Sequence, residues 1–356
     1  MDNELRIVIS GGGTGGHIFP AVSIANAIKA KRPEAKILFV GALGRMEMQR
    51  VPAAGYEIKG LPVRGLIRPL WSPKNIGVLI DYLKSKGMAK KIIKDFKPMA
   101  AVGVGGYASG ATLDAAHALG IPSLIQEQNS YAGKTNKMLS TKADKIMMTG
   151  NPVRQNIVNA EISHEDAVKQ FGLDPEKKTI LIVGGSLGAR TVNESVLAHL
   201  KEIKESGVQF IWQTGKYYHE SIMQKMASHN DMPMLKVMDF ISDMGAAYKA
   251  ADLVISRAGA SSISEFCLIG KPVILVPSPN VAEDHQTKNA MALVEKDAAL
   301  MVKDVEAKDN VIKLALTTVG DAAKLVSLAT NVKKLGLPHS ADIIADEVLK
   351  LAENKK

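Results

Sequence analysis

The feature that most constrains the fold of this chain is an apolar segment, a glycine-rich turn and a helical pattern, in an order that occurs twice. Residues 6–28 read RIVISGGGTGGHIFPAVSIANAI, and residues 179–196 read TILIVGGSLGARTVNESV. A strand that enters a helix through a tight glycine turn is the building unit of an open parallel sheet. The 356 residues are also too many for one ordinary core. The repeat therefore predicts two α/β domains.

Further apolar segments, rich in Val, Ile and Leu, are expected to be strands buried on both faces, because they do not alternate with polar residues. In the first half they are residues 5–9, 37–40, 56–61, 100–104 and 123–126. In the second half they are residues 179–183, 209–213, 235–240, 253–256, 273–276 and 299–302.

The strands alternate with helical patterns, which predicts two Rossmann-like, doubly wound domains. We expect residues 1–157 and a C-terminal helix at about 339–356 to form one domain, and residues 158–338 the other. Asn151-Pro152 interrupts the pattern near the boundary. Ligands of open α/β sheets bind at the carboxyl ends of the strands, so the binding site is expected in a cleft between the domains.

Composition narrows the function classes. The single cysteine, Cys267, excludes a disulfide framework and favours a reducing compartment. The start MDNELRIVIS lacks the features of a signal peptide, and no apolar stretch approaches the roughly 20 residues that span a bilayer. The net charge of +9 indicates an anionic partner, or only a soluble surface. Nucleic acid is disfavoured, because aromatic residues make up only 4% and no recognition motif occurs.

The first glycine loop satisfies G-x-G-x-x-G with Gly11, Gly13 and Gly16. A dinucleotide site also needs an acidic residue at the end of the second strand, where this chain has Val40, Gly41 and Ala42, so NAD binding is disfavoured. The loop then offers backbone N–H groups at a helix N-terminus to an anion or a sugar. A bare strand-to-helix turn is the alternative, but it needs fewer glycines.

His17 follows this loop directly. The positive field at a helix N-terminus disfavours a protonated ring, so His17 is expected to be neutral and able to act as a base. A histidine that only packs or caps is the alternative, and the residues alone do not decide between the two.

In the second half, residues 256–279 read SRAGASSISEFCLIGKPVILVPSP. A helix is expected to begin near Ala260, Ser261 and Ser262, with N–H groups placed for a phosphate. Glu265 is expected in its first turn, where it could bond a ribose diol. A capping box with Ser262 as the cap is the alternative, and both can hold together. Cys267 on the same helix is expected in the core.

Three polar segments add weaker candidates. Gln286, within SPNVAEDHQTKNA, could bond sugar hydroxyls, but a polar loop has the same composition. Asn129 follows a strand of the first domain. Arg154, in GNPVRQ, could pair with a phosphate or be a surface residue of the hinge. The sequence contains no Asp-x-Asp pair of the kind that would suggest a metal site.

Residues 65–98 combine apolar and basic character. Ile76 and Leu79 keep helical spacing with Ile80 and Leu83, and six lysines but one acidic residue lie between positions 84 and 97. Apolar residues beside lysines suit a surface that contacts anionic lipid. The expected membrane patch consists of Leu70, Trp71, Ile76, Leu79, Lys84, Lys90, Lys91 and Lys94. An amphipathic helix with a buried apolar stripe and solvated lysines is the alternative.

The motifs SGGGTGGHIFPA, GGYASGA, QEQN, TNK, GNPVR, GGSLGAR, DFISDM, RAGASSISE and EDHQTKNA occur in this order. Together they resemble the MurG family of bacterial glycosyltransferases over nearly the whole chain. The resemblance implies a GT-B fold and a cytoplasmic, peripheral position on the inner membrane. It implies inverting transfer of GlcNAc from UDP-GlcNAc to the C4 hydroxyl of MurNAc in undecaprenyl-pyrophosphoryl-MurNAc-pentapeptide, with no cofactor. A UDP-GlcNAc epimerase of the same fold and a non-catalytic binder of nucleotide sugars or lipid carriers are the rivals.

The resemblance also implies roles for individual residues, whereas His17 as a candidate base follows only from its place after the glycine loop. The implied donor contacts are Thr14, Gly15, Gly16 and Asn129 near the sugar, Arg154 and Ser186 near the pyrophosphate, the backbone of Ile241 at the uracil, Ala260, Ser261 and Ser262 at the phosphate, Glu265 at the ribose and Gln286 at the sugar.

Two features depart from the family pattern. Gln286 is followed by Thr287 where the family often has a second Gln, which puts one sugar contact in doubt. The strand at residues 145–148 also runs almost directly into GNPVR, where related sequences carry a longer connection. We expect this shortening to affect interdomain geometry more than donor binding, because the donor motifs are intact.

Overall fold

The computed structural model describes residues 4–13, 15–65, 71–128, 134–148, 150–153, 155–185, 187–229, 231–281 and 284–354. The chain divides into two compact units. The first comprises Met1–Arg154 with His339–Lys356, and the second comprises Gln155–Pro338. The division falls three residues before the expected position, because α6 (Gln155–Val158) packs against α11 (Met244–Ala250) and α12 (Ala260–Ile269) of the second unit.

The first unit contains a six-stranded sheet of order β3-β2-β1-β4-β5-β6 in which all neighbouring strands are parallel. The strands are β1 (Arg6–Gly11), β2 (Lys36–Ala42), β3 (Glu57–Leu61), β4 (Ala100–Gly105), β5 (Ser123–Gln126) and β6 (Lys145–Met147). The helices are α1 (Gly15–Lys31), α2 (Glu47–Ala53), α3 (Lys74–Phe96), α4 (Tyr107–His117), α5 (Lys134–Leu139) and α16 (Ser340–Glu353).

Helices cover both faces of this sheet, which explains why its strands lack polar alternation. Ile7 and Ile9 of β1 point into a core formed with α1 and α16, while Val8 points into a second core formed with α3 and α4. All three side chains are fully buried. Alternate residues of one strand therefore serve two apolar layers, as expected for a doubly wound sheet.

The second unit repeats this plan with the strand order β12-β11-β10-β7-β8-β9, again parallel throughout. Its strands are β7 (Thr179–Val183), β8 (Gln209–Gln213), β9 (Leu235–Met238), β10 (Leu253–Ser256), β11 (Val273–Leu275) and β12 (Leu300–Met301). Its remaining helices are α7 (His164–Gln170), α8 (Arg190–Ala198), α9 (Leu200–Glu205), α10 (His219–Met226), α13 (His285–Val294), α14 (Asp304–Gly320) and α15 (Ala322–Lys334).

All eleven strands expected from apolar patterning are present, and β6 accounts for the segment at 145–148. Only their ends differ, by one or two residues. For example, β9 ends at Met238 rather than residue 240, because it is an edge strand that pairs only with β8. The presence of each strand therefore followed from the local sequence, whereas its length depended on the strands that pair with it in the sheet.

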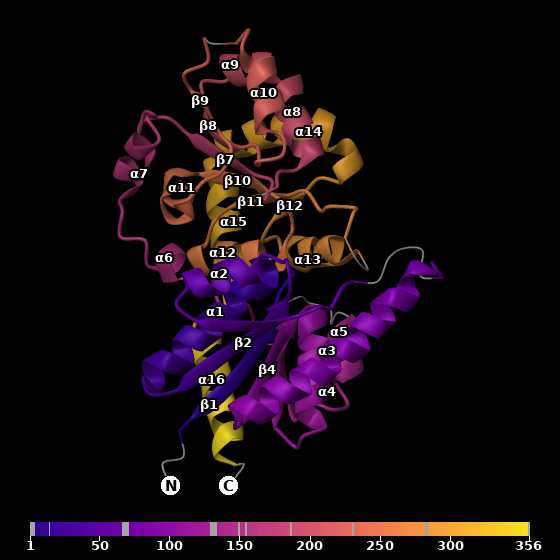
Figure 1. The fold of residues 1–356 in the computed structure, drawn as a ribbon. Coiled ribbons are helices and arrows are strands. Elements are labelled where there is room, and N and C mark those ends of the chain that lie inside the picture. The colour runs from indigo at the N-terminus through magenta and orange to yellow at the C-terminus, as the bar shows by residue number, and fades with distance from the viewer. Residues whose placement is uncertain are drawn as a thin grey trace. The chain divides into compact units, whose positions relative to one another are not determined.

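The C-terminal helix α16 belongs to the first unit, although the second unit separates it from the rest in sequence. Figure 1 shows it in yellow, and it packs against helix α1 and against strands β4 and β5. Ile344 and Val348 are fully buried in the core that α1 also lines. The ion pairs Lys31–Asp346, Arg32–Glu353 and Lys145–Glu347 fasten the exposed side of the helix.

Candidate active site

Close neighbours exclude a side chain at Gly12, in the glycine loop between β1 and α1, and at Gly106, which follows β4. The backbone of the loop is tied to the end of β4, since the Gly12 N–H donates to the Gly105 carbonyl at 3.3 Å. A Cβ atom on Gly12 would lie 2.1 Å from Oε1 of Glu47. A Cβ atom on Gly106, whose φ is +90°, would lie 2.6 Å from the Gly12 carbonyl oxygen. The glycines thus allow a close backbone approach in a conformation that side chains rarely adopt.

His17 lies in the first turn of α1 and is partly buried. Its Nδ1 atom is 2.9 Å from the carbonyl oxygen of Gly12. A carbonyl oxygen can only accept a hydrogen bond, so Nδ1 carries the hydrogen, and in a neutral ring the lone pair is then on Nε2. Gly105 leaves room for this edge of the ring, because a Cβ atom there would lie 2.9 Å from Nε2. The ring is therefore oriented with Nε2 as its basic atom.

Glu47 is a residue of this site that the sequence interpretation missed. Its side chain is completely buried, and its Oε1 and Oε2 atoms accept hydrogen bonds from the N–H groups of Ala42 and Gly13, each at 3.0 Å. A dinucleotide site would place an acidic residue at the end of β2, whereas Glu47 lies five positions beyond that end, in α2. The detectable signal was an acidic residue that follows the small residues of GALGRME.

In the second unit, α12 begins at Ala260 and its N-cap is Gly259. A Cβ atom on Gly259 would meet nothing within 4 Å, so the backbone is open to approach there. Next along the helix, the Ser261 hydroxyl is buried and has no hydrogen-bond partner among the residues that the structure describes. Ala260, Ser261 and Ser262 thus surround N–H groups that point out of a helix N-terminus, an arrangement that suits an anion.

Glu265 lies in the second turn of α12, not in the first turn as expected. The alternative interpretation, a capping box at Ser262, is wrong, because the helix begins two residues before Ser262 and is capped by Gly259. The Glu265 side chain is buried, and its Oε2 accepts a hydrogen bond of 2.8 Å from the Tyr248 hydroxyl on α11. Cys267, two residues further along the helix, is in the core as expected, and burial raises the pKa of its thiol to about 11.

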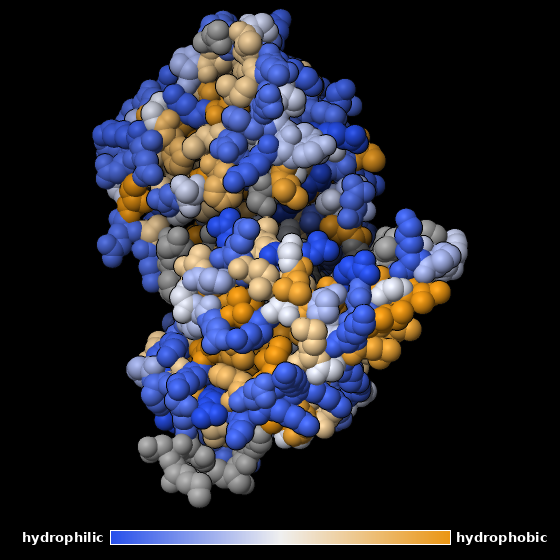
Figure 2. All heavy atoms as spheres, viewed as in Figure 1, coloured by the Kyte–Doolittle hydropathy of each residue, from blue (hydrophilic) through white to orange (hydrophobic). Residues whose placement is uncertain are grey.

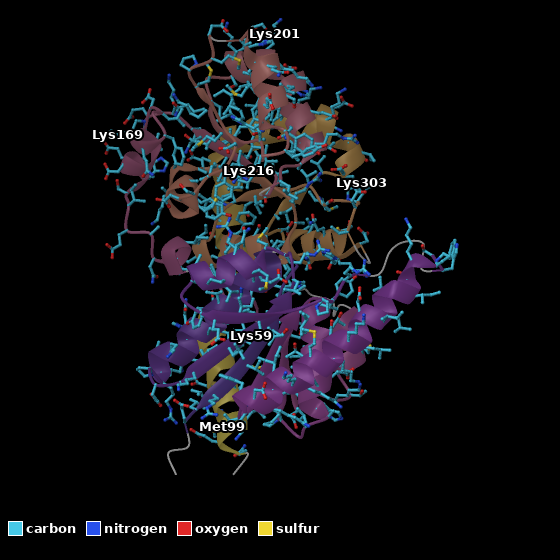
Figure 3. All side chains as sticks on the ribbon, viewed as in Figure 1. Lys59, Met99, Lys169, Lys201, Lys216 and Lys303 are labelled. Atoms are coloured by element: carbon cyan, nitrogen blue, oxygen red, sulfur yellow. The ribbon has the colours of Figure 1, made fainter. Side chains whose placement is uncertain are left out.

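Gln213, at the end of β8, joins two loops of the second unit. Its Nε2 donates to the Gly185 carbonyl at 3.1 Å, and its Oε1 accepts from the Ile241 N–H at 3.1 Å. The Ile241 N–H is thus already hydrogen-bonded, so its carbonyl is the backbone group that could accept a hydrogen bond from a nucleobase. Lys216, labelled in Figure 3, comes from the loop after β8, and its Nζ lies 5.6 Å from the centroid of the Phe240 ring.

Gln286 lies in the first turn of α13, and its Oε1 accepts a hydrogen bond of 2.8 Å from the Ser278 N–H. This bond fixes the amide and leaves its NH2 end as the donor for a sugar hydroxyl. Thr287, which replaces the second Gln of the family pattern, donates a hydrogen bond of 2.7 Å to Asp284, the N-cap residue of α13.

The structure brings the expected residues together in two groups, one in each unit. Gly15, Gly16 and His17 follow β1 in the first unit. Ile241, the start of α12, Glu265 and Gln286 follow the carboxyl ends of strands in the second. Thr14, Asn129, Arg154 and Ser186 lie outside the described residues. Within the described ranges, no group of three or more His, Cys, Asp or Glu residues could hold a metal ion.

Helix α3 turns an apolar stripe toward solvent. The exposed fractions are 85% for Trp71, just before the helix, 67% for Ile76 and 60% for Leu79. Ile80 and Leu83 are exposed as well, and Figure 2 shows this stripe as orange atoms along α3. The stripe is therefore not part of the core, which contradicts the alternative interpretation of this helix. Leu70 lies outside the described residues.

The opposite face of α3 supplies the core instead, through Val78, Ala89 and Ile93. In the second half of the helix, Lys84, Lys91 and Lys94 are exposed and Lys90 is partly so. No helix in the described part of the chain is long and apolar enough to cross a membrane.

Comparison with known proteins gives two family matches. Residues 7–148 match the glycosyltransferase family 28 N-terminal domain, and residues 179–344 match the glycosyltransferase family 28 C-terminal domain. A UDP-N-acetylglucosamine–N-acetylmuramyl-(pentapeptide) pyrophosphoryl-undecaprenol N-acetylglucosamine transferase from Phocaeicola vulgatus is 64% identical over 369 aligned positions, which cover 99% of this chain and 98% of that protein. This alignment is longer than the chain, so the relative holds residues that the chain lacks.

Among solved structures, the crystal structure of Acinetobacter baumannii MurG has a TM-score of 0.78 and 28% identity, over 97% of this chain and 99% of that one. A Listeria monocytogenes protein described as a UDP-N-acetylglucosamine 2-epimerase has a TM-score of 0.69 but 13% identity, over 99% and 96% of the two chains, and it shares the fold alone. The chain has two parallel sheets with alternating helices, and its fold is similar to that of the Acinetobacter baumannii MurG structure. Together these observations establish the GT-B fold. With both domain matches and near-complete alignment at 64% identity, the chain belongs to the MurG family within glycosyltransferase family 28.

Proposed function

We propose that this chain is a hexosyltransferase that moves GlcNAc from UDP-GlcNAc to the C4 hydroxyl of the MurNAc residue in undecaprenyl-pyrophosphoryl-MurNAc-pentapeptide. The observation that carries the proposal is the 64% identity to the Phocaeicola vulgatus transferase over 99% of this chain. The epimerase alternative has only a shared fold at 13% identity in its favour. Fold alone does not assign a reaction.

The second unit would bind the donor. The N–H groups at the start of α12 and the Ser261 hydroxyl would contact the pyrophosphate. The Ile241 carbonyl would accept from the uracil, and Glu265 would bond the ribose hydroxyls. Gln286 would donate to the sugar through its NH2 group, since its oxygen is held by Ser278.

The reaction would be one displacement at the anomeric carbon. The acceptor C4 oxygen forms the new bond, the bond from the anomeric carbon to the UDP oxygen breaks, and the configuration inverts. The acceptor proton goes to Nε2 of His17, the ring atom that holds the lone pair when Nδ1 bonds Gly12. The α12 N-terminus would stabilise the negative charge that develops on the leaving UDP.

The exposed stripe and lysines of α3 would hold the protein at the cytoplasmic face of the inner membrane. Trp71, Ile76 and Leu79 offer apolar surface, and the lysines that follow offer positive charge to anionic lipid. A lipid-linked acceptor stays in the membrane, so an enzyme that uses it needs such contact.

Incubation with labelled UDP-GlcNAc, with and without a lipid-linked MurNAc acceptor, tests the proposal. We expect a labelled disaccharide lipid only when the acceptor is present. An altered UDP-sugar formed without acceptor would identify an epimerase. UDP binding by calorimetry without any turnover would identify a non-catalytic binder, and either result would overturn the proposal.

A further inference from the structure

Glu47 and His17 bond opposite ends of the same peptide group. The peptide between Gly12 and Gly13 donates its N–H to Oε2 of Glu47 at 3.0 Å, and its carbonyl oxygen lies 2.9 Å from Nδ1 of His17. We propose that Glu47 is a positioning residue for the transfer reaction, which acts through this peptide to hold His17 in the tautomer and orientation that make Nε2 the base. The inference rests on the proposed function, because it needs His17 as the base.

The contacts of Glu47 give its carboxylate a single position. Its side chain has no solvent exposure, and its second oxygen is fixed by the Ala42 N–H at 3.0 Å. A Cβ atom on Gly12 would lie 2.1 Å from Oε1, and one on Gly41 would lie 2.6 Å from Cγ. Two segments of backbone are thus glycine where they close around this side chain. The pocket fits a carboxylate and leaves no room for it to swing away.

The geometry couples the carboxylate to the histidine electrostatically. A hydrogen bond to a charged acceptor is stronger than a neutral one, and it polarises the peptide that donates it. The carbonyl at the other end of that peptide then becomes a better acceptor for Nδ1–H. It also stabilises the imidazolium that forms when Nε2 takes a proton. In hydrolase triads a carboxylate does this by bonding the histidine directly. Here one peptide group stands between them.

Support of the loop alone would be a different role, and the structure contains other supports. The Gly12 N–H bonds the Gly105 carbonyl independently of Glu47. Loss of Glu47 should therefore disturb the Gly12–Gly13 peptide, to which His17 is hydrogen-bonded, without unfolding the loop. If Glu47 had a purely structural role, its loss would lower the stability of the protein, and its effect on the chemical step would not depend on the presence of His17.

Glu47→Gln is the informative variant. Gln keeps the shape of the side chain, but its NH2 end must face one of the two backbone N–H groups, so one hydrogen bond is lost. We expect kcat to fall roughly 10- to 100-fold, as when partners that orient functional histidines are removed. KM for UDP-GlcNAc should not change, because the fully buried Glu47 is not among the residues proposed to bind the donor. Asp114→Asn is the matched control, since Asp114 is also a buried carboxylate of the first unit but bonds Lys86 and Lys142. It should leave kcat unchanged.

Two measurements separate positioning from structural support. In a His17→Ala background, Glu47→Gln should lower kcat by about twofold or less, because residues that act as one unit are not additive. In ¹⁵N spectra of histidine-labelled protein, the His17 signals should be those of the Nδ1–H tautomer. In the Glu47→Gln variant, signals of the Nε2–H tautomer should appear as well. If Glu47→Gln lowers kcat equally in both backgrounds, or leaves the tautomer unchanged, the inference is overturned.

The proposed function can fail separately. Normal kcat in His17→Ala would remove His17 as the base, and this inference with it, whatever Glu47→Gln does. Reduced kcat in His17→Ala together with normal kcat in Glu47→Gln would overturn the role of Glu47 and leave the proposed function intact.

Discussion

At the residue scale, the Gly12 carbonyl determines which ring nitrogen of His17, the proposed base, carries the hydrogen. The sequence pointed to His17 through its place after the glycine loop. It did not show which ring nitrogen would carry the hydrogen, because that depends on a carbonyl five residues away and on Glu47 beyond it. His17 could be named from the sequence as a candidate, whereas its tautomer could not.

For His17 we predict that His17→Ala lowers kcat by roughly 10²–10⁴, the usual contribution of a positioned base. KM for UDP-GlcNAc should change little, since a base acts mainly in the transition state. Steady-state kinetics with a soluble acceptor analogue provides the measurement. Normal kcat with weaker acceptor binding would instead make His17 a residue that positions the acceptor.

A second prediction at this scale concerns Glu265. Glu265→Gln should weaken UDP binding by about 1–3 kcal/mol, because a charged hydrogen bond to the ribose is lost while the bond from Tyr248 can remain. Calorimetric titration measures the change. The matched control is 2′-deoxy-UDP, which should lose less affinity than UDP on the same substitution. Equal losses for both ligands would place Glu265 away from the ribose.

At the scale of elements, α3 shows why periodicity alone is ambiguous. Its sequence contains apolar residues at helical spacing, but these belong to two opposite faces, one in the core and one in solvent. A helical repeat indicates that residues share a face without saying which face meets the sheet. Only the packing of α3 against α4 decided that Val78 is buried and Ile76 exposed.

For α3 we predict binding to vesicles that contain anionic lipid, with partial release by salt. Replacing Lys84, Lys90, Lys91 and Lys94 with Gln should weaken binding by up to about 1 kcal/mol per lysine and leave UDP affinity unchanged. Sedimentation with vesicles measures both effects.

The charge-matched control for this experiment replaces four exposed lysines of the second unit with Gln, namely Lys201, Lys303, Lys308 and Lys313. Lys201 and Lys303 are labelled in Figure 3. If this control weakens binding as much as the α3 variant does, the attraction reflects net charge and not a defined patch. Failure of the unaltered protein to sediment at low salt would contradict the membrane proposal itself.

At the scale of the whole molecule, the chain leaves the first unit, forms the second, and returns to complete the first. Helix α16 contributes Ile344, Ala345, Val348 and Ala352 to the core around α1 and β1. The folding of the N-terminal unit therefore depends on the last residues of the described chain. The match to the family's C-terminal domain ends at residue 344, within α16, although this helix belongs to the first unit.

We predict that Ile344→Ala destabilises the first unit by about 2–5 kcal/mol, the usual range for truncating a buried isoleucine. Its neighbour Ile343 is 44% exposed, and Ile343→Ala should cost about 0.5 kcal/mol or less. Denaturant unfolding with and without UDP measures the effect, because a ligand of the second unit should protect only that unit. Equal effects of the two substitutions would mean that α16 is not docked as described.

The amino-acid sequence by itself determined the two α/β units, the positions of their strands and the glycine turns, because apolar runs and glycines act on the backbone locally. It also determined the family, since the motifs occur in order along the chain. Only the tertiary structure decided that Glu47 bonds the Gly13 N–H, that Gln213 joins two loops, and that α12 begins at Ala260 so that Glu265 meets Tyr248. These contacts join residues that are separate in sequence, and which of them meet is set by how strands order in the sheet and how helices pack upon it.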